Sequence, residues 1–459
     1  MPSSDPSGVT APKIDQRLLE AEILEVGRRL ATGSGSDLQH PIRALNERAM
    51  QLASRDQELR AALFRLVDVT PATRSLDDLG RHLAGLVGEV GSPPPPLEAA
   101  LRTAHTKAGR IALGAAVAAA VRHMSRRFIV GASAADARRE ILSMWEAGIA
   151  STVDLLGEVT VTASEADAYR DRCLETLDQL EAGLRAGPER PVLERDSLGA
   201  LPRANLSVKI TALTPLIRAE APERGAADAA GRLRTLLDRA RALGAHLHLD
   251  MESLDARETT MEVVFDLLDS PEFRDGPSAG LVLQAYLRDS PGQLDRILEW
   301  AASSPRTSPV IVRLVKGAYW DHEVAEARQH GWDVPVFTDK AECDRNFEAL
   351  TRRLLAARPG VRVAIGSHNV RSLAHAIALN RLAGGDDSDL ELQVLRGLGD
   401  DLALTLAAEG LRVRVYCPVG DLVAGMAYLV RRLLENTSNE SFLWAAAEGA
   451  PLEELLAAP

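Results

Sequence analysis

The sequence predicts an α/β fold, a (βα)8 TIM barrel preceded by a small all-helical N-terminal domain. Two observations predict the barrel. Eight short runs rich in β-branched and aliphatic residues alternate with amphipathic segments of helical periodicity, as strands and helices alternate in βαβ units. Polar side chains stand at the ends of these runs, and in a parallel barrel the carboxyl ends converge on one face. A doubly wound sheet is the alternative, but no Gly-rich fingerprint follows the first run.

The barrel strands are expected in the later part of the chain. In order, the eight predicted strands are Thr152–Leu156, Leu206–Ile210, His246–Asp250, Leu281–Gln284, Val310–Leu314, Val361–Ile365, Leu390–Val394 and Val413–Tyr416. The 459 residues leave room for a further domain in front of them. That part has a helical pattern with breaks at Gly33–Gly35 and Pro71. Pro93–Pro96 stops any helix, and we interpret it as a stiff spacer at a domain boundary.

We therefore expect five segments. They are a disordered N-terminus over 1–13, a helical arm and domain over 14–92, a linker with helices over 93–147, the barrel over 148–446 and a C-terminal tail over 447–459. The apolar run Ile111–Val121 is too short to span a bilayer. Its many small residues predict a buried, closely packed helix.

The composition narrows the possible functions. A net charge of −12 argues against nucleic-acid binding, which needs a basic surface. The three cysteines are widely spaced and show no Cys/His metal spacing, which favours a reducing, cytoplasmic setting and predicts no metal site. The first residues lack the pattern of a signal peptide, so any membrane association is expected to be peripheral.

Every predicted strand has a polar residue at or near its end. In order these are Glu158, Lys209, Asp250, Gln284, Arg313, His368, Gln393 and Tyr416. One such residue usually belongs to a packing layer or the rim, but eight at the same end are hard to explain by packing. They predict a ligand site on the C-terminal face of the barrel.

Aromatic residues sharpen this prediction. Three of the five tyrosines, Tyr286, Tyr319 and Tyr416, fall at or just past strand ends. Rings near cations suit a flat cofactor, or a small apolar ring that carries a carboxylate. Capping of the barrel is the plainer interpretation, which we favour for Tyr286 alone.

A helical stripe follows the eighth strand. Tyr428, Arg431, Arg432 and Glu435 lie at i, i+3, i+4 and i+7, which places them on one face. Alone, this pattern is typical of a solvated ion pair. Over the mouth of a barrel it predicts a bidentate clamp for a carboxylate, with Glu435 holding Arg431 in place.

Two other interpretations stay open at this point. Lys209 or Lys316 suits a Schiff-base aldolase, and a degenerate barrel on a helical scaffold would not be an enzyme. Many donors and few groups able to act as a general base favour instead an electron-rich cofactor with an anionic substrate, as in flavin chemistry.

Several motifs together resemble one known family. They are Arg313–Trp320, Tyr428–Asn436, Ser207–Lys209, Gln284–Tyr286, Ser367–Asn369 and Tyr416–Gly420. The chain resembles the proline dehydrogenase domain of proline utilization A over about residues 100 to 458. One departure is Arg396–Gly399, where family members often have His-Gly-Met-Gly.

The resemblance implies oxidation of L-proline to Δ1-pyrroline-5-carboxylate by non-covalent FAD, with hydride passing from C5 to the flavin N5. Electrons would then pass to a quinone, which implies a cytoplasmic enzyme that contacts the inner membrane peripherally. In proline utilization A an aldehyde dehydrogenase half follows such a domain. We expect either a fragment of that bifunctional enzyme or a split form with a separate partner.

The resemblance also implies roles for individual residues. The implied catalytic residues are Arg313, Lys209, Asp250 and Tyr319. The implied substrate-binding residues are Arg431, Arg432 and Lys209 at the proline carboxylate, Tyr416 and Leu395 at the ring, and Glu158 and Glu435 beside the arginines. The implied FAD-binding residues are Asp250, Gln284, Arg313, Lys316, Gly317, Tyr319, Thr338, Lys340, His368 and Phe442.

Overall fold

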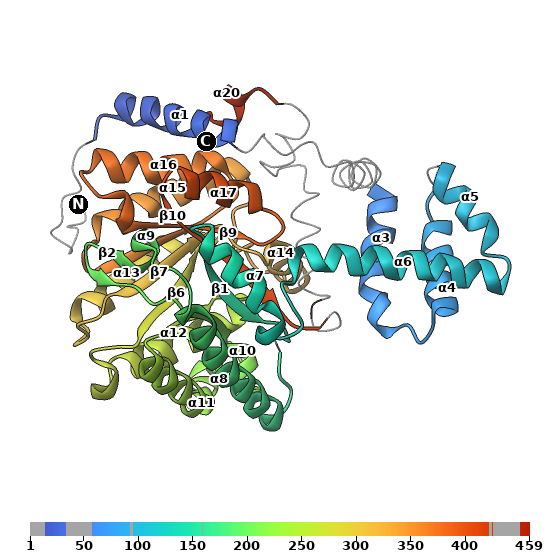
Figure 1. Ribbon diagram of the computed structural model, residues 1–459, viewed down its shortest axis with the longest axis horizontal. Coiled ribbons are helices and arrows are strands. Elements are labelled where there is room, and N and C mark those ends of the chain that lie inside the picture. Colours follow the sequence, from blue (N-terminus) through green and yellow to red (C-terminus); the bar gives the residue numbers. More distant parts are fainter. Residues whose placement is uncertain (1–13, 34–56, 92–94, 158, 422–424, 426–449) are drawn as a thin grey trace.

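A closed parallel barrel forms the centre of the computed structural model, which describes residues 14–33, 57–91, 95–157, 159–421, 425 and 450–459 (Figure 1). Its strands follow the order β1-β10-β9-β8-β7-β6-β5-β4. They are β1 (Ala150–Leu155), β4 (Asn205–Lys209), β5 (His246–Asp250), β6 (Ser278–Gln284), β7 (Val310–Val315), β8 (Val361–Gly366), β9 (Leu390–Leu395) and β10 (Arg412–Val419). The predicted (βα)8 barrel is confirmed, and each of the eight predicted runs forms one of its strands.

Helices surround the barrel and cover its outer face (Figure 1). They are α7 (Ala134–Glu146), α8 (Ala163–Arg185), α11 (Pro222–Leu243), α12 (Leu254–Leu268), α13 (Ser290–Ser303), α14 (Trp320–His330), α15 (Lys340–Ala356), α16 (Val370–Leu382) and α17 (Asp400–Ala408). Local signals set several of their ends. Thr162 and Glu165 form a capping box at the start of α8, and Gly244 ends α11 in the left-handed conformation.

Short elements complete the connections. They are α9 (Pro191–Glu194), α10 (Ile210–Leu213), α20 (Leu452–Leu455), the 3-10 turns η1 (Thr70–Ala72), η2 (Pro271–Phe273) and η3 (Asp387–Asp389), and the hairpin strands β2 (Arg195–Asp196) and β3 (Gly199–Ala200). The hairpin lies against the amino-terminal end of the barrel, because Asp196 accepts two hydrogen bonds from Arg362 near the start of β8, at 2.8 and 3.0 Å.

Buried charges also fill the interior of the barrel. The Glu391 carboxylate on β9 accepts two hydrogen bonds of 2.9 Å from Arg414 on β10. Burial raises the pKa of Glu391, but Arg414, Arg412 and the hydrogen bond from Gln393 together outweigh it and lower the pKa to about 2. Gln393 donates to the same carboxylate at 2.6 Å. Gln393 therefore belongs to this interior network and not, as its sequence position suggested, to the polar groups at the strand ends.

The N-terminal helix α1 (Gln16–Gly33) lies along α16, beside the C-terminal residues (Figure 1). Its apolar face, which includes Leu19 and Ile23, belongs to the hydrophobic core of the barrel. This arrangement separates α1 from the other N-terminal helices. Within the predicted segment 14–92, the structure therefore shows an arm on the barrel and a distinct helical group.

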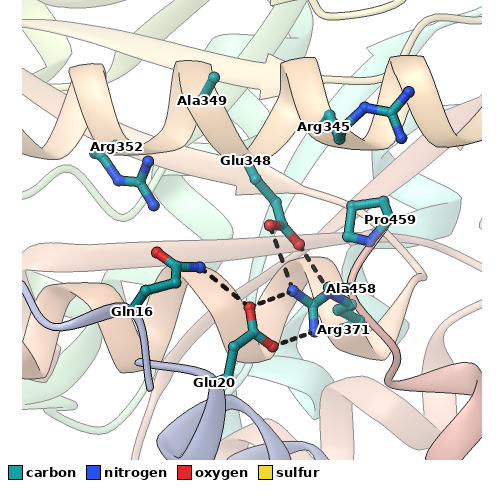
Figure 2. A pocket seen from close by; sticks show the side chains of 9 residues that line it. All are labelled: Gln16, Glu20, Arg345, Glu348, Ala349, Arg352, Arg371, Ala458 and Pro459. Atoms are coloured by element: carbon teal, nitrogen blue, oxygen red, sulfur yellow. Dashed lines mark hydrogen bonds and ion pairs between the residues drawn. The ribbon is translucent and has the colours of Figure 1, made fainter. Parts of the chain in front are cut away.

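Arg371 of α16 joins α1 and the C-terminal residues to the barrel. It binds both carboxylate oxygens of Glu20 at 2.9 and 3.0 Å, Glu348 of α15 at 2.9 Å, and the Leu456 carbonyl at 2.7 Å. Figure 2 shows Arg371, Glu20 and Glu348 beside a shallow cavity of about 240 Å³ that Pro459 also lines. Arg371 thus holds α1, α15 and the C-terminal residues together at this cavity.

Four helices form a separate group that projects from the barrel (Figure 1). They are α3 (Gln57–Val69), α4 (Leu76–Gly88), α5 (Pro95–Thr103) and α6 (Lys107–Phe128). Contrary to the expectation that Pro93–Pro96 stops any helix, Pro95 and Pro96 begin α5, where proline is tolerated in the first turn. Residues of α3 and α4 before this run and of α5 and α6 after its start contribute to one hydrophobic cluster. The domain boundary at these prolines stays a prediction, and we propose instead that this helical unit extends through α6.

Helices α4 and α6 cross at very close range. A Cβ atom on Gly114 of α6 would collide with the Leu76 carbonyl at the start of α4, so only glycine permits this approach. The prediction that Ile111–Val121 is buried was only half right. Gly114 and Val121 are buried, but Ile111 is 40% exposed. No helix in the described part of the chain is both long and apolar enough to cross a membrane.

Candidate active site

Four of the predicted site residues meet at the carboxyl end of the barrel. Lys209 ends β4 and Asp250 ends β5, and the two are direct partners in the strand register. Arg313 comes from β7 and Tyr416 from β10. The first three are buried, with exposed fractions of 5, 7 and 4%. Distant segments therefore place two cations, a carboxylate and a phenol in one small volume.

Asp250 connects this cluster. Its Oδ1 accepts a hydrogen bond of 2.7 Å from Arg313 Nη1, and its Oδ2 accepts one of 2.6 Å from the Tyr416 hydroxyl. Lys209 Nζ lies 3.7 Å from the same Oδ2. One carboxylate thus orients three of its neighbours.

Lys209 has a second acidic partner that the sequence reasoning missed. Its ammonium group forms an ion pair with Asp154 of β1 and donates to the Tyr416 hydroxyl at 3.4 Å. Asp154 is fully buried. A signal for Asp154 was present, since it is the one charged residue within the apolar run Thr152–Leu156, and buried charges require partners.

The surroundings of Tyr416 keep its hydroxyl protonated. Burial, followed by the negative charges of Asp154 and Asp250, raises the pKa of Tyr416 well above its usual value. The Arg313 guanidinium carbon lies 5.6 Å from the centre of the Tyr416 ring, within the range of a cation–π interaction. Tyr416 therefore presents a fixed ring face at the mouth of the barrel.

A second group of cations lies after β7. Lys316 and Lys340 both form ion pairs with Asp344 of α15, the latter at 2.6 Å. Burial lowers the pKa of Lys316, opposed by Asp344. Burial raises the pKa of Asp344, but its ion pairs with the two lysines outweigh this and lower it. The sequence analysis predicted the two lysines and missed Asp344, although Lys340 and Asp344 have the i, i+4 spacing of an ion pair.

Other predicted residues line the same face. Gln284 at the end of β6 donates to the Glu252 carbonyl at 3.1 Å. His368 Nε2 accepts a hydrogen bond of 2.9 Å from the Leu395 backbone N–H at the end of β9. Tyr319 is the N-cap residue of α14, and Thr338 is exposed just before α15.

Loops that follow the first strands are joined by residues that the sequence analysis did not identify. Thr160 donates its backbone N–H to the Thr211 carbonyl at 3.1 Å. The Thr211 hydroxyl reaches both oxygens of the buried Glu252 carboxylate, at 2.7 and 2.9 Å. Since Gln284 binds the backbone of Glu252, hydrogen bonds run from the loop after β1 to the end of β6.

Part of the predicted site lies outside the described residues. These residues are Glu158, Arg431, Arg432, Glu435 and Phe442, together with Tyr428 of the predicted stripe. The proposed carboxylate clamp therefore stays a prediction from the sequence.

Comparisons with known proteins decide the family. The model of the proline dehydrogenase family matches residues 137–445, and that of the proline utilization A N-terminal domain matches residues 20–128. The chain belongs to the proline dehydrogenase family. This membership favours the predicted oxidoreductase over the aldolase and the degenerate scaffold.

Individual relatives show how far the similarity extends. The bifunctional protein PutA of Klebsiella aerogenes is 31% identical over 77% of this chain, but the match covers only 26% of that protein. The proline dehydrogenase of Deinococcus radiodurans is 29% identical over 70% of this chain and 89% of its own length. A crystal structure of proline utilization A from Bdellovibrio bacteriovorus, inactivated by N-propargylglycine, shares 35% identity with a TM-score of 0.87, over 95% of this chain and 44% of that one. The chain thus spans about a quarter of the bifunctional relative's length and less than half of that crystallised chain.

The residues of this face fit the flavin that the family implies. Lys316 and Lys340 supply cations suited to phosphate groups. Gly317, which follows Lys316 directly, has a φ of 133°, a conformation that favours glycine. Arg313 Nε is buried and has no hydrogen-bond partner among the described residues, so the guanidinium retains a donor for a further group.

Proposed function

We propose that this protein oxidises L-proline to Δ1-pyrroline-5-carboxylate, the first step of proline catabolism, with FAD as its cofactor. When bound, FAD supplies a ring that accepts a hydride, here from C5 of proline to the flavin N5. The observation that carries the proposal is the buried cluster of Arg313, Asp250, Tyr416 and Lys209 at the carboxyl face of a proline dehydrogenase barrel.

Some residues of this cluster supply charge, and others shape the substrate pocket. Arg313 places a fixed positive charge where negative charge develops, and Asp250 holds that guanidinium in place. Tyr416 covers one side of the substrate ring, beside Leu395, its partner in the strand register. Lys209 supplies a positive charge near the substrate carboxylate.

The substrate carboxylate itself needs a bidentate partner. For this role we propose Arg431 and Arg432 on the basis of their sequence pattern. Glu158 and Glu435 are proposed to pair with these arginines. Tyr319 is proposed to complete the proline pocket, which would explain a preference for a small ring.

We propose that the cofactor is bound by residues at the carboxyl ends of the strands and in the loops that follow them. Arg313, Gln284 and Asp250 would lie near the flavin ring. The residues proposed for the ribityl chain, pyrophosphate and adenine are Lys316, Gly317, Tyr319, Thr338, Lys340, His368 and Phe442.

Partners beyond the substrate are also part of the proposal. We propose a quinone as the final electron acceptor, which requires peripheral contact with a membrane such as the inner membrane of a bacterial cell. We further propose that an aldehyde dehydrogenase half, in a longer chain or a separate protein, receives the product.

Anaerobic titration tests the proposed function directly. The purified protein is expected to be yellow, or to become so with added FAD, and L-proline should bleach its absorbance near 450 nm. D-Proline is the matched control and should leave the absorbance nearly unchanged. A protein that takes up no FAD, or holds FAD that L-proline does not reduce, would contradict the proposal.

A further inference from the structure

The segment Ala285–Leu287 directly after β6 is hydrogen-bonded to the end of β7. Ala285 donates its backbone N–H to the Val315 carbonyl at 2.8 Å, and Tyr286 donates to the Lys316 carbonyl at 2.7 Å. The position of Lys316, and of the Gly317 turn that follows, therefore depends on the backbone of this segment.

The same segment also binds the loop that leads into α15. The Tyr286 carbonyl accepts a hydrogen bond of 2.8 Å from the Phe337 N–H, and Leu287 forms an antiparallel bridge with Val336. Thr338 follows in the next position of the chain, and Lys340 begins α15. One short segment thus connects the two loops that carry the proposed phosphate contacts.

The Tyr286 side chain supports one of these loops. The ring is 4% exposed and lies directly against Gly317, where an added Cβ atom would overlap three of its carbon atoms. Gly317 has a φ of 133°, a conformation that L-residues with side chains rarely adopt. The ring therefore closes the space into which this turn would otherwise relax.

We propose that Tyr286 is a positioning residue for the cofactor, whose ring holds the Lys316–Gly317 turn at a fixed distance from the loop of Thr338 and Lys340. The inference rests on the proposed FAD. Lys316 and Lys340 share the Asp344 carboxylate, so their spacing is defined only while both loops keep their places. A pyrophosphate needs donors at a fixed spacing, because each misplaced hydrogen bond weakens binding.

The Tyr286 side chain could support the turn through its ring or through its hydroxyl. Burial raises the pKa of Tyr286 well above its usual value, although a backbone hydrogen bond from Tyr319 lowers it, so the phenol is neutral. The three atoms that an added Cβ on Gly317 would meet are all ring carbons of Tyr286. The ring is therefore the part of the side chain that contacts the turn.

The test measures the FAD affinity of each variant, and the thermal stability of the apoprotein shows whether the variant is folded. Tyr286→Leu is expected to raise the FAD dissociation constant, measured by quenching of flavin fluorescence, about tenfold or more. Tyr286→Phe is the matched control, because it keeps the ring, and its dissociation constant should stay within about twofold of wild type. Equal affinity of the Leu variant and the wild type would overturn the proposal, as would a Phe variant as weak as the Leu variant.

A double-mutant cycle keeps the test valid if Tyr286→Leu unfolds the apoprotein. Gly317→Ala alone should weaken FAD binding, because its Cβ meets the ring and because a φ of 133° is strained for alanine. Combined with Tyr286→Met, whose flexible side chain fills part of the space left by the ring, Gly317→Ala should weaken binding less than it does in the wild type, because only the strain remains. Additive losses would overturn the proposal. If the wild type binds no FAD, the proposed function fails; if the wild type is bleached by proline while the variants behave like it, only this inference fails.

Discussion

Two buried charge clusters lie in the same barrel and differ in their place along the strands. In the interior network, the Glu391 carboxylate accepts hydrogen bonds from two nitrogens of Arg414 and from Gln393, and Arg412 beside it keeps two nitrogens without a hydrogen-bond partner among the described residues. At the carboxyl face, Asp250 orients Arg313 and Tyr416, and Arg313 Nε lacks a hydrogen-bond partner among the described residues. Both clusters thus contain unpartnered donors, but only the second lies at the end of the barrel that we propose binds the ligand.

The comparison teaches how position along a strand separates stability from function. Arg414 lies inside β10, and Asp250 and Lys209 end their strands. Residues inside the strands, such as Arg414, stabilise the barrel. Residues at the strand ends, such as Asp250 and Lys209, are available for chemistry at its mouth.

Arg414→Met should produce the largest loss of stability. The change leaves Glu391 without its main partner in a buried site, which typically costs about 3–5 kcal/mol. Denaturant unfolding of the purified protein measures the effect. A decrease in the free energy of unfolding below about 1 kcal/mol would show that the interior network of Glu391 and Arg414 does not stabilise the barrel.

Arg313→Met should instead reduce catalysis. Removal of a preorganised charge near the reacting atoms typically costs about 100- to 1000-fold in turnover, and the unfolding midpoint should change much less than in Arg414→Met. Anaerobic stopped-flow reduction by proline measures the rate. A variant that keeps its turnover would refute the assignment of the cluster at the carboxyl face to the active site.

The pH dependence of stability should reflect Glu391. Its folded pKa of about 2 lies below the ordinary value of 4.5, so its contribution is complete above about pH 4.5 and disappears as the pH falls toward 2. That gap corresponds to about 3 kcal/mol. Denaturant unfolding between pH 5 and pH 3 should show wild-type stability decreasing more steeply than that of Glu391→Gln. Parallel pH profiles would contradict the prediction.

Tyr416→Phe should have the smallest effect. The ring remains, and only the hydroxyl that donates to Asp250 at 2.6 Å is lost. A hydrogen bond to a charged group contributes about 1.5–3 kcal/mol, and with both other partners of Asp250 still in place we expect about a tenfold loss in kcat/KM for proline. An unchanged kcat/KM would show that the Tyr416 hydroxyl does not contribute to the active site.

Most of the fold was accessible to sequence reasoning because strand and helix periodicity are local properties. All eight barrel strands were found, Lys209 and Asp250 end their strands as expected, and Arg313 and Tyr416 lie within β7 and β10 near the carboxyl ends. The residues whose roles were not predicted have partners on other strands, which the sequence does not show. Gln393 and Glu391 lie on the same strand, and only the register with Arg414 on β10 shows that Gln393 serves the interior.

The sequence by itself determined the alternation of strands and helices, the polar residues at the strand ends and the family motifs. These features depend on spacing along the chain, which any window of residues reveals. Only the tertiary structure decided that α1 lies on α16, that Asp154 pairs with Lys209, and that Tyr286 supports Gly317. Each of these contacts joins residues far apart in sequence, and its geometry exists only once the barrel has closed.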